Sequence, residues 1–278
     1  MIDVGLRVWR ATRIVGIAML AAVAIASARA PHRGVADESA AIPVRYAEGT
    51  VHGFLELRTA AGALLAHGDL LQVVKDGAIE SRMLFRFPTS VFEETVTFTQ
   101  RGVFTMQHYH LVQSGTAFAD DLDVTLERSG AYVIKTLSHR DGKARTFTGT
   151  LELPPDIYNG MVITVAKNLP AGAGKTVHIV AFTPEPRIIA LELAPSGTDH
   201  VLNGTHEEAV SHIILKPKLG VILKFFATLK GIAPPDSHVW IVTDLVPAFV
   251  RYQGPLFTGP VWRINLTSPT WAQVGKSE

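Results

Sequence analysis

Cysteine is absent from the chain, so the side chain that carries disulfides, thiolate-bound metals and thiol nucleophiles is missing. This excludes disulfide-stapled folds, Cys-ligated zinc, iron–sulfur clusters and cysteine-based catalysis. Charged residues are also few, at 18% of the 278 residues against 47% hydrophobic ones. Such a composition is typical of a folded globular protein and not of a disordered or collagen-like one.

The chain also lacks an excess of charge of either sign, with 26 Lys and Arg against 25 Asp and Glu. A protein that binds nucleic acid needs a basic surface to neutralise phosphates, and this balance does not readily supply one. Nucleic acid is therefore not expected as a partner.

The first thirty residues carry the pattern of an export signal. Residues 14–26 form an uncharged apolar run, which is shorter than the about 20 residues that a membrane-spanning helix needs. Arginines precede this run, and residues 26–28 (Ala-Ser-Ala) give the small-x-small pattern that signal peptidase recognises. The sequence thus predicts a cleavable signal peptide over residues 1–28 and a periplasmic or secreted protein. The alternative is an uncleaved amphipathic anchor.

Removal of residues 1–28 takes three arginines and one aspartate from the totals, which leaves a near-neutral mature chain with 23 basic and 24 acidic residues. Without cysteine the mature chain cannot be a lipoprotein. Residues 29–43 show no periodicity and are expected to be a flexible lead-in, followed by a single β-rich domain over residues 44–278.

Alternation of apolar and polar residues dominates the chain from residue 44 onward, which predicts half-buried β-strands. Strands are expected at 51–58, 70–75, 79–87, 91–99, 103–113, 122–128, 176–182, 187–193, 207–216, 238–243, 248–253 and 261–266. Turn sequences separate them, and Asp76-Gly77 and Asp141-Gly142 are the best candidates for two-residue hairpins. This spacing favours an antiparallel sandwich or barrel.

Two segments depart from the alternation. Residues 157–169 follow two prolines and repeat apolar residues at helical spacing, which predicts a short helix. Residues 217–229 begin with a proline and precede Gly231, which predicts a second helix. This second segment has almost no polar face, so it is expected either to fill the core or to form a lid over an apolar ligand or a surface that meets lipid or a partner.

Several segments resemble a group of uncharacterised exported bacterial proteins. They are Glu56-Leu57-Arg58, Arg101-Gly102-Val103-Phe104, Leu153-Pro154-Pro155-Asp156 to Lys167-Asn168-Leu169-Pro170, and the tail with His238-Val239-Trp240, Gly254-Pro255-Leu256 and Pro260-Val261-Trp262-Arg263. More distantly, the chain resembles periplasmic domains with a lipoprotein-carrier-like fold. That resemblance implies a mainly β fold in which a strongly curved antiparallel sheet, a half-barrel or open barrel, wraps two short helices. It also implies a hydrophobic cavity, which holds acyl chains in the carriers, and it brings no catalytic motif.

His108 and His110 are the metal-ligand candidates, because residues two apart in a strand share a face. A third ligand would come from Glu93, Glu94 or the acidic cluster at 120–123. The alternative, two half-exposed histidines on a solvent face, is favoured because this spacing alone is not specific for metal.

The remaining motifs do not indicate an enzymatic or nucleotide-binding activity. Residues 172–176 (GAGKT) resemble the end of a phosphate-binding loop, but Leu169 stands where that loop needs glycine, so no nucleotide is expected. No G-x-S-x-G motif is present, and Ser211-His212 and Ser237-His238 would point to opposite faces of their strands. A metal-dependent or serine hydrolase stays only a third hypothesis, with no catalytic residue assigned.

The sequence favours an exported, non-catalytic protein that binds a hydrophobic or lipid-like ligand in the concave face of the sheet, without a cofactor. The alternative is an envelope structural or accessory protein that acts through protein contacts. The residues expected to line the cavity are Phe54, Leu57, Phe85, Phe98, Met106, Leu219, Ile222, Phe225 and Phe226. In the alternative, the same side chains fill the core.

Overall fold

The structure is a computed structural model that describes residues 41–182, 185–203, 206–218, 235–243, 246–257 and 259–267. The signal peptide expected over 1–28 and the apolar segment 219–229 lie outside these residues. The strands are β1 (Val51–Thr59), β2 (Leu64–Lys75), β3 (Ala78–Arg86), β4 (Ser90–Arg101), β5 (Val103–Gly115), β6 (Asp120–Glu127), β7 (Ala131–Ser138), β8 (Ala144–Thr150), β9 (Lys175–Ala181), β10 (Arg187–Asn203), β11 (His206–Lys218), β12 (Ser237–Val242), β13 (Ala248–Gly254) and β14 (Trp262–Thr267). The prediction of a mainly β, antiparallel protein is confirmed.

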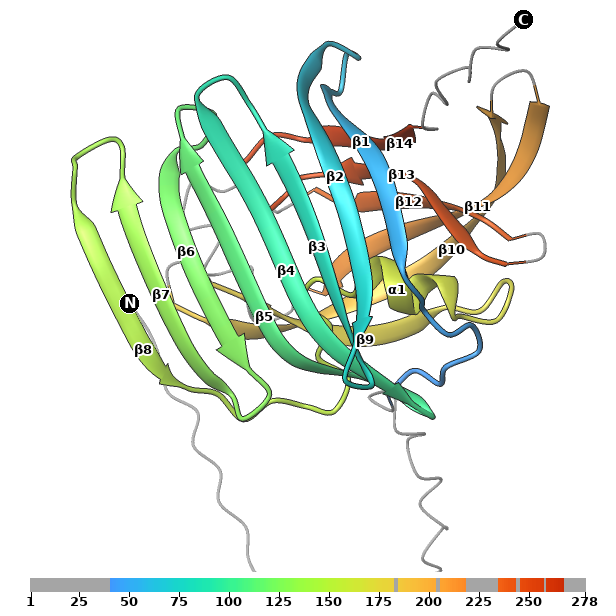
Figure 1. Ribbon diagram of the computed structural model, residues 1–278, viewed down its shortest axis with the longest axis horizontal. Helices are drawn as coiled ribbons and strands as arrows, with labels where there is room; N and C mark the ends of the chain where they lie inside the picture. The colour runs from blue at the N-terminus through green and yellow to red at the C-terminus, as the bar shows by residue number, and fades with distance from the viewer. Residues whose placement is uncertain are drawn as a thin grey trace, which may run out of the picture. The chain divides into compact units, whose positions relative to one another are not determined.

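All fourteen strands belong to one antiparallel sheet with the order β8-β7-β6-β5-β4-β3-β2-β1-β14-β13-β12-β11-β10-β9. Strands β1 to β8 lie side by side in chain order, as Figure 1 shows, and β9 to β14 do the same. The pair of β1 with β14 joins the two halves, so the first and last strands meet at the centre of the sheet. Among the described residues β8 and β9 do not pair, and the sheet is not closed.

One of the two expected hairpin turns is confirmed. Asp76 and Gly77 both have positive φ, 53° and 76°, between β2 and β3, as a type I′ turn requires. The second expectation is wrong, because residues 139–143 connect β7 to β8 and only Gly142 among them has a positive φ, of 66°. The amide of Lys143 lies near the Asp141 side chain at 3.3 Å, which fits a longer polar turn.

The structure has one short helix among its described residues, and this corrects the expectation of two. Helix α1 covers Val162–Lys167, six residues inside the expected 157–169. Ile157 instead forms an isolated bridge with His178, and residues 159–161 form a turn in which Gly160 has a φ of +69°. Pro217 and Lys218, the expected start of the second helix, are the end of strand β11, where they pair with β10.

The two faces of the sheet differ in chemistry. The inner face is the one whose side chains form the hydrophobic core. Five cross-strand neighbours lie there in one row, and all are apolar except for the glutamate: Leu70, Met83, Glu94, Leu111 and Val124. The outer face carries ion pairs, such as Arg82 with Glu93 at 2.6 Å. The inner side chains form one hydrophobic cluster with residues from both halves of the sheet.

Candidate functional site

A small cavity lies between α1 and the inner face of the sheet. Its volume is about 90 Å³. Most of its lining is aliphatic or aromatic, and the polar groups on it are Gln72, Ser81, Glu94, Thr164 and Lys167. The apolar side chains are Leu55, Leu70, Met83, Val96, Ile163, Phe249 and Ile264, and Gly160 completes the wall.

Glu94 is the most unusual residue of this cavity. It is half-buried and lines the cavity, in the middle of the otherwise apolar row on β3, β4 and β5. The hydroxyl of Tyr109 donates to its Oε1 at 2.9 Å. Burial raises the pKa of the Glu94 carboxyl to about 6, while the hydrogen bond from Tyr109 acts in the opposite direction. A carboxyl of this kind changes its charge close to neutral pH.

The sequence itself carries a signal that sets Glu94 apart from its neighbours on the strand. Phe92, Val96 and Phe98 alternate along the expected strand 91–99, and Glu94 falls on the same face as these three. A carboxylate on the apolar face of a strand is rare enough to mark a candidate site. Glu93 lies next to it on the opposite face, where its pairing with Arg82 lowers the pKa of its carboxyl.

Two tyrosines near Glu94 remain uncharged phenols. Burial, together with the negative charge of Glu94, raises the pKa of Tyr109 well above its ordinary value. Burial also raises the pKa of Tyr252 to about 12. The Tyr252 hydroxyl donates to the carbonyl oxygen of Pro255 at 2.7 Å, and the Tyr109 ring stacks on Phe182 with centroids 5.9 Å apart.

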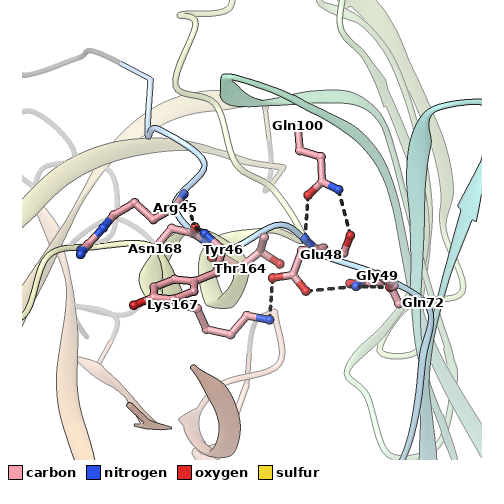
Figure 2. A network of polar contacts seen from close by, with 9 residues as sticks. All are labelled: Arg45, Tyr46, Glu48, Gly49, Gln72, Gln100, Thr164, Lys167 and Asn168. Carbon is pink, nitrogen blue, oxygen red and sulfur yellow. Dashed lines mark hydrogen bonds and ion pairs between the residues drawn. The ribbon is translucent and has the colours of Figure 1, made fainter. Parts of the chain in front are cut away.

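Figure 2 shows a polar network beside α1, and two of its members, Gln72 and Lys167, line the cavity. The ammonium of Lys167 lies 2.6 Å from Oε1 of Glu48, and these side chains are 17% and 8% exposed. Gln72 donates to Oε2 of Glu48 at 3.0 Å and to the carbonyl of Gly49 at 2.8 Å. Gln100 exchanges two hydrogen bonds with the backbone of Glu48, of 2.7 and 2.8 Å. The charge of Lys167 is thus already met by Glu48.

The same network fixes the segment before β1. Oδ1 of Asn168 accepts hydrogen bonds from the amides of Arg45 and Tyr46, at 2.9 and 2.7 Å. Of the expected lead-in 29–43 the structure describes residues 41–43, and Ile42 there is 3% exposed. The amide of Ile42 donates to the hydroxyl of Tyr158 at 2.8 Å, so this part of the lead-in is anchored.

Tyr158→Phe is expected to lower the free energy of unfolding by about 1 kcal/mol, because it leaves the amide of Ile42 without its acceptor. Denaturant titration of the two proteins measures the difference. Tyr132→Phe serves as the control: Tyr132 on β7 is half-buried, and its hydroxyl makes no hydrogen bond with the described residues, so its loss is expected to change less. Equal stability of wild type and Tyr158→Phe would show that the anchor contributes nothing.

The described residues among those predicted to line a ligand cavity do not share one surface. Leu57, Phe85, Phe98 and Met106 are completely buried in the packed core, and none of them lines the cavity. Phe54 is 42% exposed on the outer face and does not line the cavity. Phe54 and Leu57 are three residues apart, and in a strand such residues point to opposite sides. Leu219, Ile222, Phe225 and Phe226 lie outside the described residues.

His108 and His110 lie on the outer face, each beside one carboxylate of β6. Nδ1 of His108 lies 2.9 Å from Glu127, and Nε2 of His110 lies 3.0 Å from Asp123. Asp123 also contacts Lys135 at 3.3 Å. Within the described part of the chain no three His, Asp or Glu side chains converge as a metal site would require.

Two further histidine clusters were not predicted. Nε2 of His212 lies 2.9 Å from Nδ1 of His238, and the His212 ring stacks on Trp240. Burial and the neighbouring His238 lower the pKa of His212. Elsewhere His178 contacts both carboxylate oxygens of the fully buried Asp156, at 2.9 and 3.0 Å. Neither cluster borders the cavity.

No helix in the described segments has the length and apolar character to cross a membrane. The chain matches no protein-family model, no curated protein and no solved structure. The cavity and its side chains are therefore the features that point to a function.

Proposed function

We propose that the protein is an exported, non-catalytic binding protein that holds one end of a hydrophobic or lipid-like molecule in the cavity beneath α1. The observation that carries the proposal is an interior space with mostly apolar walls, on which Glu94 is the one acidic group among the described lining residues. Binding sites for small molecules combine these features: mostly apolar walls and a few placed polar groups. The likeness to lipoprotein-carrier domains supports the same class of ligand.

The size of the cavity limits what it can enclose. Its volume of about 90 Å³ is smaller than the roughly 300 Å³ at which pockets begin to enclose whole drug-sized ligands. A cavity of about 150 Å³ holds a benzene ring. The cavity therefore suits one end of a longer molecule, whose remainder lies outside it.

A concave inner face is supported by contacts between strands far apart in the sheet. Tyr109 on β5 stacks on Phe182, which directly follows β9, and these strands are ten positions apart in the sheet order. Neighbouring strands are spaced by about 4.8 Å, so a flat sheet would separate them by about 48 Å. We propose that the sheet bends back as a half-barrel and that the ligand enters its concave side.

Native mass spectrometry of the mature protein from its own envelope, followed by organic extraction, tests the proposal. We expect a stoichiometric adduct that contains an alkyl chain. Ser81→Leu fills the cavity and should lose this adduct, whereas Thr95→Leu, on the outer face of β4, should retain it. A clean apoprotein that also binds none of octylamine, 1-octanol and octanoate would exclude the proposed function.

A second candidate is contact with an envelope protein through the edge of β8. This strand ends the sheet, and nearly all of its residues are exposed on both faces. Such an edge can accept a strand from another protein. Thr148→Pro blocks a backbone hydrogen bond at this edge, so chemical cross-linking in the envelope should lose a partner in this variant if the second candidate is right.

A further inference from the structure

The charges around the cavity do not balance. Among the described residues that line it, Lys167 is the one basic side chain, and Glu48 lies 2.6 Å from its ammonium. Glu94 is the one acidic side chain, and the described residues offer its carboxylate a single hydrogen bond, from the neutral Tyr109 hydroxyl. An ionised Glu94 is therefore a negative charge in apolar surroundings without a positive partner. Such an arrangement is unfavourable unless a cation reaches it.

We propose that the cavity selects ligands with a primary ammonium head on an alkyl chain, which pairs with the carboxylate of Glu94. This inference rests on the proposed function, because it names the class of ligand that the same cavity binds. The ammonium supplies the missing positive charge and donors for the free lone pairs of the carboxylate. The first methylenes of the chain lie against apolar side chains such as Leu70, Met83 and Phe249.

The geometry disfavours the other head groups that a lipid-like molecule can carry. A fatty-acid carboxylate would approach Glu94 with a charge of the same sign, in surroundings that screen charge poorly. The one cation on the wall, Lys167, is held by Glu48 and would have to leave a short ion pair to compensate. An alcohol can donate one hydrogen bond to Glu94, but it leaves the charge of the carboxylate unneutralised.

Three ligands of equal chain length test this inference: octylamine, 1-octanol and octanoate, each titrated calorimetrically into the mature protein near pH 8. We expect octylamine to bind at least about tenfold more tightly than the other two, the ratio that corresponds to about 1.4 kcal/mol. Glu94→Gln keeps the size of the side chain and should abolish this preference. Glu93→Gln removes a neighbouring charge from the outer face and should leave the preference unchanged.

A second variant supplies the cation from the protein itself. Met83 is the cross-strand neighbour of Glu94, so Met83→Lys places an ammonium beside the carboxylate and should weaken octylamine binding by about tenfold or more.

The proposed function and the ammonium preference would be contradicted by different results. If octanol or octanoate binds as tightly as octylamine and Ser81→Leu abolishes all binding, the cavity is a binding site but the ammonium preference is wrong. If none of the three binds, the proposed function is wrong, and the inference with it.

Discussion

Lys167→Met is expected to lower the free energy of unfolding by about 3 kcal/mol, since it leaves Glu48 as a buried carboxylate without its cation. The Glu48 side chain is 8% exposed, and among the described residues its carboxylate then keeps one hydrogen bond, from Gln72. The same contacts hold the segment before β1 against α1, so the loss is expected to loosen that segment as well. Equilibrium unfolding in guanidinium chloride measures the change.

A double variant separates the ion pair from the packing of the lysine stem. Glu48→Gln combined with Lys167→Met keeps an acceptor for Gln72 but removes the buried charge, so it should be clearly more stable than Lys167→Met alone. Lys135→Met is the matched control: its partner Asp123 lies 3.3 Å away, and the two side chains are 62% and 42% exposed. Its effect should stay below about 1 kcal/mol. Equal losses for both lysine variants would contradict a buried pair.

Glu94→Gln is expected to stabilise the protein at neutral pH, by about 2 kcal/mol. Burial raises the pKa of Glu94 to about 6 from an ordinary 4.5, so in this interval the folded protein binds more protons than the unfolded chain. The wild type therefore loses stability as pH rises through 6, at about 1.4 kcal/mol for each pKa unit. Below pH 4.5 Glu94 is protonated in both states, and the advantage of Glu94→Gln should vanish. Tyr109 and Tyr252 titrate far above this interval.

Glu93→Gln should shift stability in the opposite direction, although it alters the adjacent residue. The hydrogen bond from Arg82 lowers the pKa of Glu93, so its contribution is present above the ordinary pKa and is lost as pH falls through the folded value. The side chain is 32% exposed, and the loss at neutral pH should stay below about 1 kcal/mol. Unfolding curves of both variants from about pH 4 to pH 8 test the pair. If Glu94→Gln lowers the stability at neutral pH, as Glu93→Gln is expected to do, then Glu94 has a compensating cation.

The expected gain from Glu94→Gln bears on function. A carboxylate that destabilises the folded protein at neutral pH is not explained by stability. Retention of an unfavourable charge is typical of binding and catalytic sites, where local rules of packing are broken for the sake of a ligand. A variant that is more stable and no longer distinguishes octylamine from octanol would link the two effects.

Several elements follow from the order of residues alone. Period-two alternation predicted the three last strands to within about one residue, because each strand has one apolar and one polar face. Asp76-Gly77 predicted its turn because positive φ is readily adopted by these residue types. The helix at 157–169 was overestimated, because the stretch before α1 is held by backbone pairing of Ile157 with His178 on β9.

The sequence by itself determined the class of the protein, mainly β and antiparallel, because strand periodicity and turn chemistry are local properties. The tertiary structure decided which strands pair, and it paired β1 with β14, which lie near opposite ends of the domain's sequence. It also decided that Leu57, Phe85, Phe98 and Met106 fill the core while a cavity forms beside Glu94. A space between side chains depends on how distant segments pack, here α1, β4 and β13, and no local pattern encodes that distance.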